Sequence, residues 1–260
     1  MLWFCRLLFI LTPSCYCAPA FAHAGGDEVY LWRYQFLKGD LTRIKSRIRV
    51  ECQISDRTVA TVIDTVTLDR TQSVNARGDA EMLETIDTFE SSYNGRQIPD
   101  DVKSHTILAI TMDRRGQVLQ GNPRGTPDPY RIRALWQMMM ERPAPDTAIK
   151  IGETWRSDVT NCFVQGEKTS VVSKLIKAEK VSGIDTLRIG VRMSIQPDAA
   201  ADDKEYVTVV GYYNVDPLAG RLVHSEYTLS NVPVRGQDGN GVMCITIKDD
   251  REPVSRTSIL

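Results

Sequence analysis

The sequence has few of the residues on which enzymes and metal centres usually depend. Three histidines and six cysteines occur in 260 residues, and no C-x-x-C pair is present. The nucleophile-elbow, zinc-protease, phosphate-loop and dinucleotide-binding patterns are also missing. We therefore predict no catalytic residue, no metal site and no cofactor. An enzyme whose residues converge from distant segments is kept only as a third hypothesis.

One pair of titratable residues has a spacing compatible with chemistry. His224 and Glu226 are two positions apart, and so lie on one face of a predicted strand. Such a pair can form an acid–base couple or part of a metal site. A single pair of this kind is far more often a surface contact, and we interpret it as one.

An excess of charge of one sign is lacking too. The formal net charge is -1 at pH 7, so no global field attracts the chain to nucleic acid or to an anionic membrane. The apolar run near the N-terminus, from Leu7 to about Tyr16, is shorter than the roughly 20 residues of a membrane span. We expect no nucleic-acid partner and no transmembrane span.

The N-terminus has the pattern of an export signal. Arg6 precedes the apolar run, and Ala20, Ala22 and Ala24 form two overlapping A-x-A cleavage sites. We predict a signal peptide over residues 1–24, cleaved after Ala22 or Ala24, and a single domain over residues 25–260. The mature chain is expected to be periplasmic or secreted, with lipid anchoring through Cys15 or Cys17 as the less favoured alternative.

Strand patterns dominate the rest of the chain. Aromatic residues alternate over residues 30–36, and Lys38-Gly39-Asp40 is expected to turn that strand into the next one, at residues 41–54. Further alternating runs are separated by turn signals, and we count about eleven or twelve strands in all. A transmembrane barrel is disfavoured, because charged and polar residues occur on both parities of residues 58–74.

One helix is expected, over residues 129–142. Pro129 suits the first helical position, and Pro143 ends the run. Between them Ile132, Leu135, Trp136 and Met139 form an apolar stripe at helical spacing. A single helix of this kind must pack on the sheet.

Several turn motifs carry a resemblance to known proteins. The K-G-D turn, the "DRRGQV" hairpin, "IGETW" and "DPLAGRLV" together resemble a broad set of uncharacterised exported bacterial proteins. Their overall pattern looks like the half-barrel fold of the periplasmic lipoprotein carriers of the Lol system. The resemblance implies a mainly β fold in which a strongly curved antiparallel meander forms a half-barrel, with one helix packed on its concave face.

The segment 41–54 carries a row of bases on one parity: Arg43, Lys45, Arg47 and Arg49. This row can bind anionic groups, but an acidic ribbon over residues 80–91 is expected to neutralise it across neighbouring strands. The acids considered there are Glu81, Glu84, Asp87 and Glu90. We interpret the row as marking the solvent-exposed face.

These observations leave two main functions open. The first is an extracytoplasmic carrier that holds an apolar or amphiphilic ligand, such as a lipid, between the curved sheet and the helix. The second is a structural or protein-interaction domain with a filled core, whose protein partner is unknown. Five inward residues are predicted to line the carrier's cavity: Trp32, Ile44, Ile48, Trp136 and Met139.

Three cysteines follow the predicted leader: Cys52, Cys162 and Cys244. In an oxidising compartment, an odd number allows one disulfide and one free thiol, or three buried thiols. Cys162 lies in a polar stretch that accommodates a bridged sulfur more easily than ordered sheet does. We predict a disulfide between Cys162 and Cys244, with Cys52 as a buried thiol.

Overall fold

The computed structural model describes residues 28–54, 57–98, 106–123, 141–161, 167–196, 206–236 and 239–254, which are mostly β-strand. The strands in the first half of the chain are β1 (Val29–Tyr30), β2 (Leu41–Ile54), β3 (Arg57–Val74), β4 (Ala80–Tyr93), β5 (Arg96–Ile98), β6 (Thr106–Met112) and β7 (Val118–Pro123). Those in the second half are β8 (Ile149–Lys150), β9 (Thr154–Thr160), β10 (Lys168–Val181), β11 (Ile184–Ile195), β12 (Val207–Asp216), β13 (Arg221–Gly236) and β14 (Gly239–Pro253).

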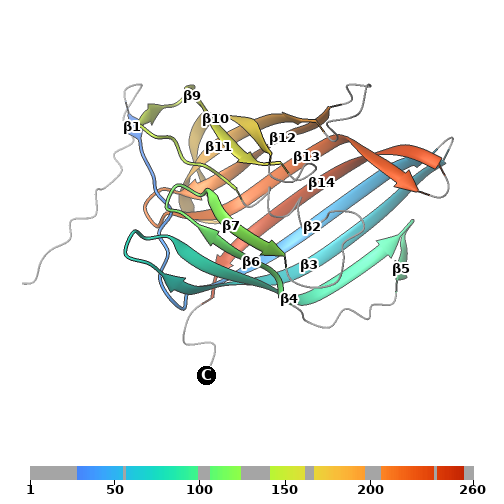
Figure 1. The fold of residues 1–260 in the computed structure, drawn as a ribbon, viewed down its shortest axis with the longest axis horizontal. Coiled ribbons are helices and arrows are strands. Elements are labelled where there is room, and N and C mark those ends of the chain that lie inside the picture. The colour runs from blue at the N-terminus through green and yellow to red at the C-terminus, as the bar shows by residue number, and fades with distance from the viewer. Residues whose placement is uncertain are drawn as a thin grey trace, which may run out of the picture.

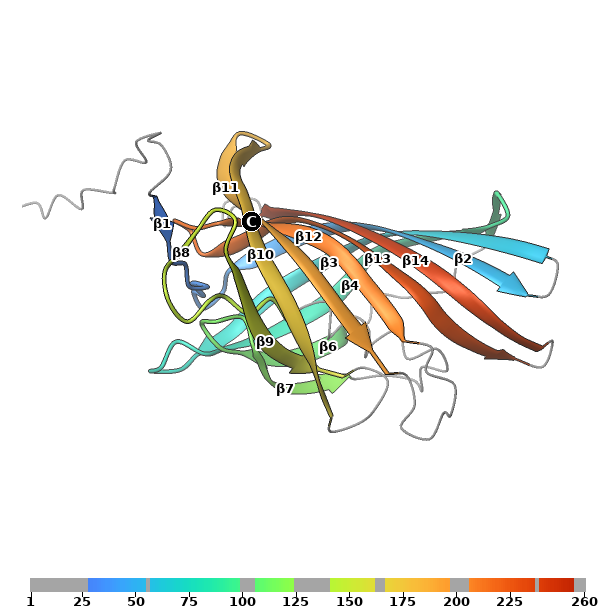
Figure 2. The same ribbon diagram turned by 90° about the horizontal axis from the view of Figure 1, so that it is seen from above.

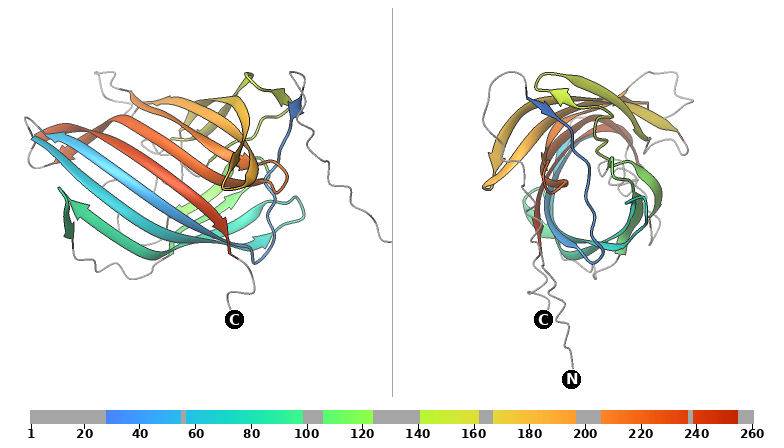
Figure 3. Two further views of the ribbon diagram at one scale, coloured as in Figure 1. Left: turned by 180° about the vertical axis from the view of Figure 1, so that it is seen from behind. Right: turned by 90° about the vertical axis from the view of Figure 1, so that its left-hand side faces the viewer.

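All strands but β1 and β8 form one 12-stranded antiparallel sheet (Figure 1), in the order β7-β6-β4-β3-β2-β14-β13-β12-β11-β10-β9, with β5 paired to β4. The expected meander is therefore present as two meanders, joined where β2 pairs with β14. At this seam Ile54 lies opposite Gly241. Seen along its axis, the sheet curls into a nearly closed, barrel-shaped ring (Figure 3), and Figure 2 shows the length of its strands from above.

Alternation in β2 confirms the predicted inner and outer faces. Ile44, Ser46 and Ile48 are buried and point into the ring, whereas Lys45 and Arg47 between them are exposed. This follows from the period of two in a strand, which puts neighbouring side chains on opposite faces. The basic row therefore does mark the outer, solvent-exposed face.

The prediction that acids on β4 neutralise this basic row is wrong, because β3 lies between β2 and β4 in the sheet. The acids named for that role were Glu81, Glu84, Asp87 and Glu90. The observed partners are nearer. Arg47 forms a two-pronged hydrogen bond with Asp64 on β3, at 2.8 and 2.9 Å. Lys45 pairs with Glu252 on β14 at 3.3 Å, and Arg49 with Glu51 on its own strand at 2.6 Å.

Residues 31–37 are not the strand that their alternation predicts. They form no ladder; instead they cross one end of the ring (Figure 3), between two hairpins. The Tyr34 N–H donates to the Arg114 carbonyl in the β6–β7 turn at 2.8 Å, and the Gln35 N–H donates to the Gly220 carbonyl in the β12–β13 turn at 3.0 Å. We call residues 31–37 the N-terminal strap, and the end that it crosses the strapped end.

A second irregular segment, residues 141–145, lies between the two edge strands β7 and β9. Its Arg142 and Ala144 N–H groups donate to Gly116 and Arg115, beside β7, at 3.1 and 2.7 Å. On the other side, its Pro143 carbonyl accepts a hydrogen bond from the Trp155 indole, on β9, at 3.0 Å. The gap between the edges is thus bridged at this end of the sheet.

The predicted helix over residues 129–142 is not supported in the part that the structure describes. Residues 129–140 lie outside the described ranges, and Glu141 and Arg142 belong to the irregular bridging segment. Pro143 and Pro145 within that segment favour an extended backbone for the residues before them. Among the described residues there is no helix, and so none long and apolar enough to cross a bilayer.

The main hydrophobic core covers the inner face of strands β9 to β13. It contains inward side chains such as Leu175, Ile189 and Val209, which are fully buried, and it extends to Trp32 in the strap. Trp32 packs edge-on against Trp155, with ring centroids 5.7 Å apart. The strap is therefore part of the core and not a loose terminus.

Candidate functional site

The inner face of the sheet is apolar on one side and polar on the other. The apolar side is the core on β9 to β13. On β2, β3 and β4, near the strapped end, many inward residues are instead buried and polar: Ser46, Thr65, Thr67, Asp69, Thr71 and Glu84. A polar inner wall is unusual for a filled β core, because buried polar groups cost free energy unless they are hydrogen-bonded.

A pocket of about 410 Å³ lies at the strapped end, between the strap and this polar wall. Its size is within the range of small-molecule sites. Strap residues line one part of it, and the rest is lined by the ends of β2, β3, β4, β6, β13 and β14 and by the β12–β13 turn. The lining residues are Tyr34, Gln35, Phe36, Leu37, Asp40, Leu41, Thr42, Asp69, Thr71, Met82, Met112, Ala219, Gly220, Arg221, Leu222, Arg251, Pro253 and Val254.

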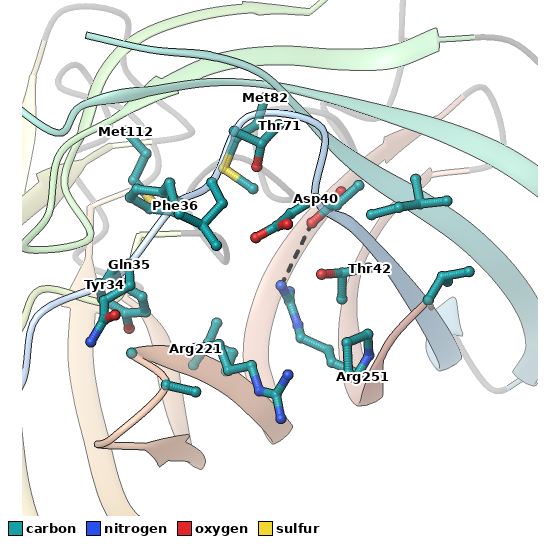
Figure 4. Close-up of a pocket in the computed structure, with 18 residues that line it drawn as sticks. Tyr34, Gln35, Phe36, Asp40, Thr42, Thr71, Met82, Met112, Arg221 and Arg251 are labelled. Atoms are coloured by element: carbon teal, nitrogen blue, oxygen red, sulfur yellow. Dashed lines mark ion pairs between the residues drawn. The ribbon is translucent and has the colours of Figure 1, made fainter. Parts of the chain in front are cut away.

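The pocket wall has an apolar side and a charged side (Figure 4). Phe36, Met82 and Met112 lie along one side, and Arg221 and Arg251 along the opposite side, with Asp40 between them. The Tyr34 and Phe36 rings are nearly parallel, with centroids 6.3 Å apart. A ligand in this pocket meets apolar and aromatic surface at one side and charged groups at the other.

A buried ion pair forms the charged side. One guanidinium nitrogen of Arg251, Nη1, lies 3.7 Å from Asp69 Oδ2, and both side chains are less than a tenth exposed. Burial raises the pKa of Asp69 to about 6; Arg251 opposes this rise, and the nearby Asp249 adds to it. The pair is long for a hydrogen-bonded salt bridge, which leaves Asp69 only partly compensated.

Two further carboxyl groups lie close to Asp69. Glu84 on β4 is directly opposite it in the ladder, and Asp249 on β14 accepts a hydrogen bond from Ser225 at 3.1 Å. Burial and the charge of Asp69 raise the pKa of Glu84 to about 8, although the Thr67 hydroxyl and Arg251 lower it in part. At neutral pH Glu84 is therefore mainly protonated.

The sequence analysis missed Asp69, Asp249 and Arg251, and it placed Glu84 on an acidic ribbon opposite the basic row; a signal for the first three exists. Asp249 and Arg251 share the parity of Ile245 and Ile247, which marks them as inward. Asp69 likewise shares the parity of the buried Thr65 and Thr67. A charged residue at a position where the strand alternation places side chains on the inner face is therefore the sequence signal for Asp69, Asp249 and Arg251.

The structure brings together only part of the predicted cavity. Trp32, Ile44 and Ile48 are buried, the first in the strap and the other two on the inner face of β2. None of the three lines the pocket at the strapped end. Trp136 and Met139 lie outside the described residues, so a cavity lined by all five residues stays a prediction.

The cysteine predictions have a similar outcome. Cys162 is outside the described residues, so its bridge to Cys244 stays a prediction. Cys244 shares the outward parity of β14, and Cys52 is half-buried on the inner face of β2 instead of buried. Burial raises the pKa of the Cys52 thiol, which makes it a weak nucleophile.

His224 and Glu226 belong to a polar network on the outer face. His224 contacts Asp250 through Nδ1 at 2.7 Å and the Tyr212 hydroxyl through Nε2 at 3.3 Å. Glu226 accepts from Tyr212 at 3.2 Å and pairs with Lys248 at 3.0 Å. These contacts are the cross-strand surface pairing that was expected for them. No group of metal-binding residues is found in the described ranges.

Comparison with known proteins gives a likeness in fold alone. No family model and no curated protein matches the sequence. Among solved structures, one of lipovitellin, described as showing lipid–protein interactions, aligns with a TM-score of 0.50 and 8% identity over 84% of this chain. The aligned part is 25% of the lipovitellin chain, so this protein spans about a quarter of its length. At this identity the likeness shows the fold alone: a large, curved antiparallel sheet.

Proposed function

We propose that the protein is an extracytoplasmic carrier that binds an apolar or amphiphilic molecule inside its barrel-shaped sheet. The observation that carries this proposal is the pocket of about 410 Å³ between the strap and the inner wall. It offers both the apolar surface and the few polar groups that small-molecule sites usually combine. The lipid-binding lipovitellin, which has a similar curved sheet, supports a lipid as the ligand class.

Export belongs to the same proposal and rests on the N-terminal pattern. Cleavage after Ala22 or Ala24 leaves the strap near the new N-terminus. The relation to the Lol carriers is proposed at the level of the curved fold only. N-terminal sequencing of the protein recovered from the periplasm or medium tests this part, and an uncleaved N-terminus contradicts it.

A structural domain without a small-molecule ligand is the second candidate. It is favoured by the tight packing on the β9 to β13 side, where Leu175, Ile189 and Leu229 are fully buried. The two functions therefore differ in whether the pocket on the opposite side is occupied.

Native mass spectrometry of protein purified from its own compartment tests the carrier. A co-purifying lipid or other apolar molecule supports it. Titration with an uncharged fluorescent fatty-alcohol analogue gives a second readout, with Met82→Trp as the variant that fills the pocket. A matched control is Val242→Trp, at an exposed position on the outer face of β14. Protein that is repeatedly empty and ignores the probe would refute the carrier and favour the structural domain.

A further inference from the structure

The buried charges next to the polar side of the pocket include more carboxylate than guanidinium charge once the pairing of Arg221 with Asp216 is taken into account. Two buried carboxylates, those of Asp69 on the pocket wall and Asp249 behind it, lie near the single guanidinium of Arg251, whereas the neighbouring Glu84 is mainly protonated and adds no charge. The other arginine of the pocket, Arg221, is already 3.6 Å from Asp216. Because a buried carboxylate is costly without a positive partner, this side of the pocket stabilises an added cation and disfavours an added anion.

The carboxyl oxygens themselves point to a missing partner. Asp69 Oδ1 and Asp249 Oδ1 are buried, and neither has a hydrogen-bond partner among the described residues. Asp69 lines the pocket directly, so its carboxylate is the one that a ligand reaches. Asp40, in the turn before β2, supplies a second acid at the pocket wall.

Aromatic surface faces these acids across the pocket. Phe36 and Tyr34, both in the strap, line the wall with their rings nearly parallel. The face of an aromatic ring attracts an ammonium group, and the attraction increases when water is excluded. A pocket with aromatic rings on one wall and carboxylates on the other is therefore suited to binding organic cations.

We infer that the pocket at the strapped end binds amphiphiles with a cationic head group of the ammonium class, held by Asp69 and the ring of Phe36. The apolar tail lies along Leu37, Met82 and Met112. This inference rests on the proposed carrier function and narrows its ligand class. An anionic head group, drawn to Arg221 and Arg251, is the alternative that the experiment must separate.

Three probes with the same tail and different head groups test the inference: dodecylamine, dodecanol and dodecanoate. Calorimetric titrations of the purified protein, below the micelle concentration or the solubility limit of each probe, give three dissociation constants. We expect the amine to bind at least about tenfold more tightly than the alcohol, and the carboxylate to bind most weakly.

Variants locate the binding site. Asp69→Asn should reduce the advantage of the amine over the alcohol to less than about threefold, whereas Asp64→Asn, on the outer face of the same strand, should leave it unchanged. Should Asp69→Asn fail to fold, Phe36→Leu serves instead, because Phe36 is only half-buried. It keeps the apolar contact and should weaken the amine about threefold without changing the alcohol.

The pH dependence gives an independent readout. The charged groups that face Asp69 are Glu84 on β4, with Asp249 and Arg251 on β14. Because a cation needs Asp69 ionised and the pKa of Asp69 is about 6, amine affinity should fall as the pH is lowered from 7.5 to 5. Dodecanol affinity should not change.

The outcomes separate the two proposals. Equal binding of all three probes, or tightest binding of dodecanoate, overturns the cationic head group and leaves the carrier in place. Binding of none of the three overturns the head-group inference, and with an empty native protein it overturns the carrier as well. A tenfold amine preference that survives in both Asp69→Asn and Phe36→Leu places the cation site elsewhere and also overturns the inference.

Discussion

The backbone of Gly116 lies directly against the ring of Tyr34. A Cβ added at Gly116 would overlap this ring, and it would lie 2.6 Å from the Arg142 carbonyl oxygen. The glycine also has a φ of +83°, in the left-handed region that side chains rarely adopt. A single position in the β6–β7 turn thus holds both the strap and the bridging segment.

We expect Gly116→Ala to destabilise the protein by about 2–4 kcal/mol, because it adds a steric overlap to the backbone strain. Gly95→Ala is the matched control. Gly95 has a similar φ of +78°, but no atom lies within 4 Å of its added Cβ. We expect Gly95→Ala to lower the free energy of unfolding, measured in urea, by only about 1 kcal/mol. Equal costs for the two variants would contradict the close packing of the strap.

The strap contains neighbouring residues with opposite roles. Trp32 is 1% exposed and packs on Trp155, whereas Leu31 is 52% exposed. Trp32→Ala should therefore cost about 3–5 kcal/mol, and Leu31→Ala less than about 0.5 kcal/mol. Denaturant unfolding measures both. A small cost for Trp32→Ala would mean that the strap does not belong to the core.

Glu84 should make stability depend on pH. The folded protein holds the carboxyl proton more tightly, with a pKa of about 8 against 4.5 for the ordinary group. Its contribution to stability is therefore complete below about pH 4.5 and is lost as the pH rises toward 8. We expect Glu84→Gln to match the natural protein at pH 5 and to be about 1–3 kcal/mol more stable at pH 8. Thermal unfolding across this range measures the difference, and a constant difference would argue against a protonated Glu84.

The basic row on β2 should contribute little to stability. Arg47 and Asp64 are both well exposed, and ion pairs in water are strongly screened. Arg47→Ala should leave the midpoint of urea unfolding unchanged within error. Adding 0.5 M salt to the natural protein should also leave this midpoint unchanged. A large shift in the midpoint would contradict the weak, solvent-screened pairing of this row.

The thiol content tests the predicted disulfide. If Cys162 and Cys244 are bridged in the exported protein, titration under denaturing, non-reducing conditions should find one free thiol per mature chain, that of Cys52. In the chain-entropy model, a loop of this length stabilises by about 4 kcal/mol. Three free thiols would rule out the bridge.

The sequence alone determines much of the local structure of this protein. Lys38-Gly39 and the turn ending at Gly220, within the "DPLAGRLV" motif, occur as turns where they were expected, with positive φ at both glycines. The inner and outer faces of β2 also follow from its alternation. These features depend on residues close in the chain, so their causes are visible in the sequence.

Only the tertiary structure decides which distant segments meet. Residues 31–37 alternate like a strand, but the turns at Arg114 and Gly220 accept their N–H groups and hold them across the end of the sheet. Glu84 belongs to the acidic segment that the sequence analysis expected to pair with the basic row of β2. In the structure Glu84 lies opposite Asp69 in the ladder and is buried near Arg251. The register shifts between β3 and β4 then set which acids of that run point inward. Such pairings bring together segments that are far apart in the sequence. The local residue pattern of one segment carries no information about which distant segment it will contact.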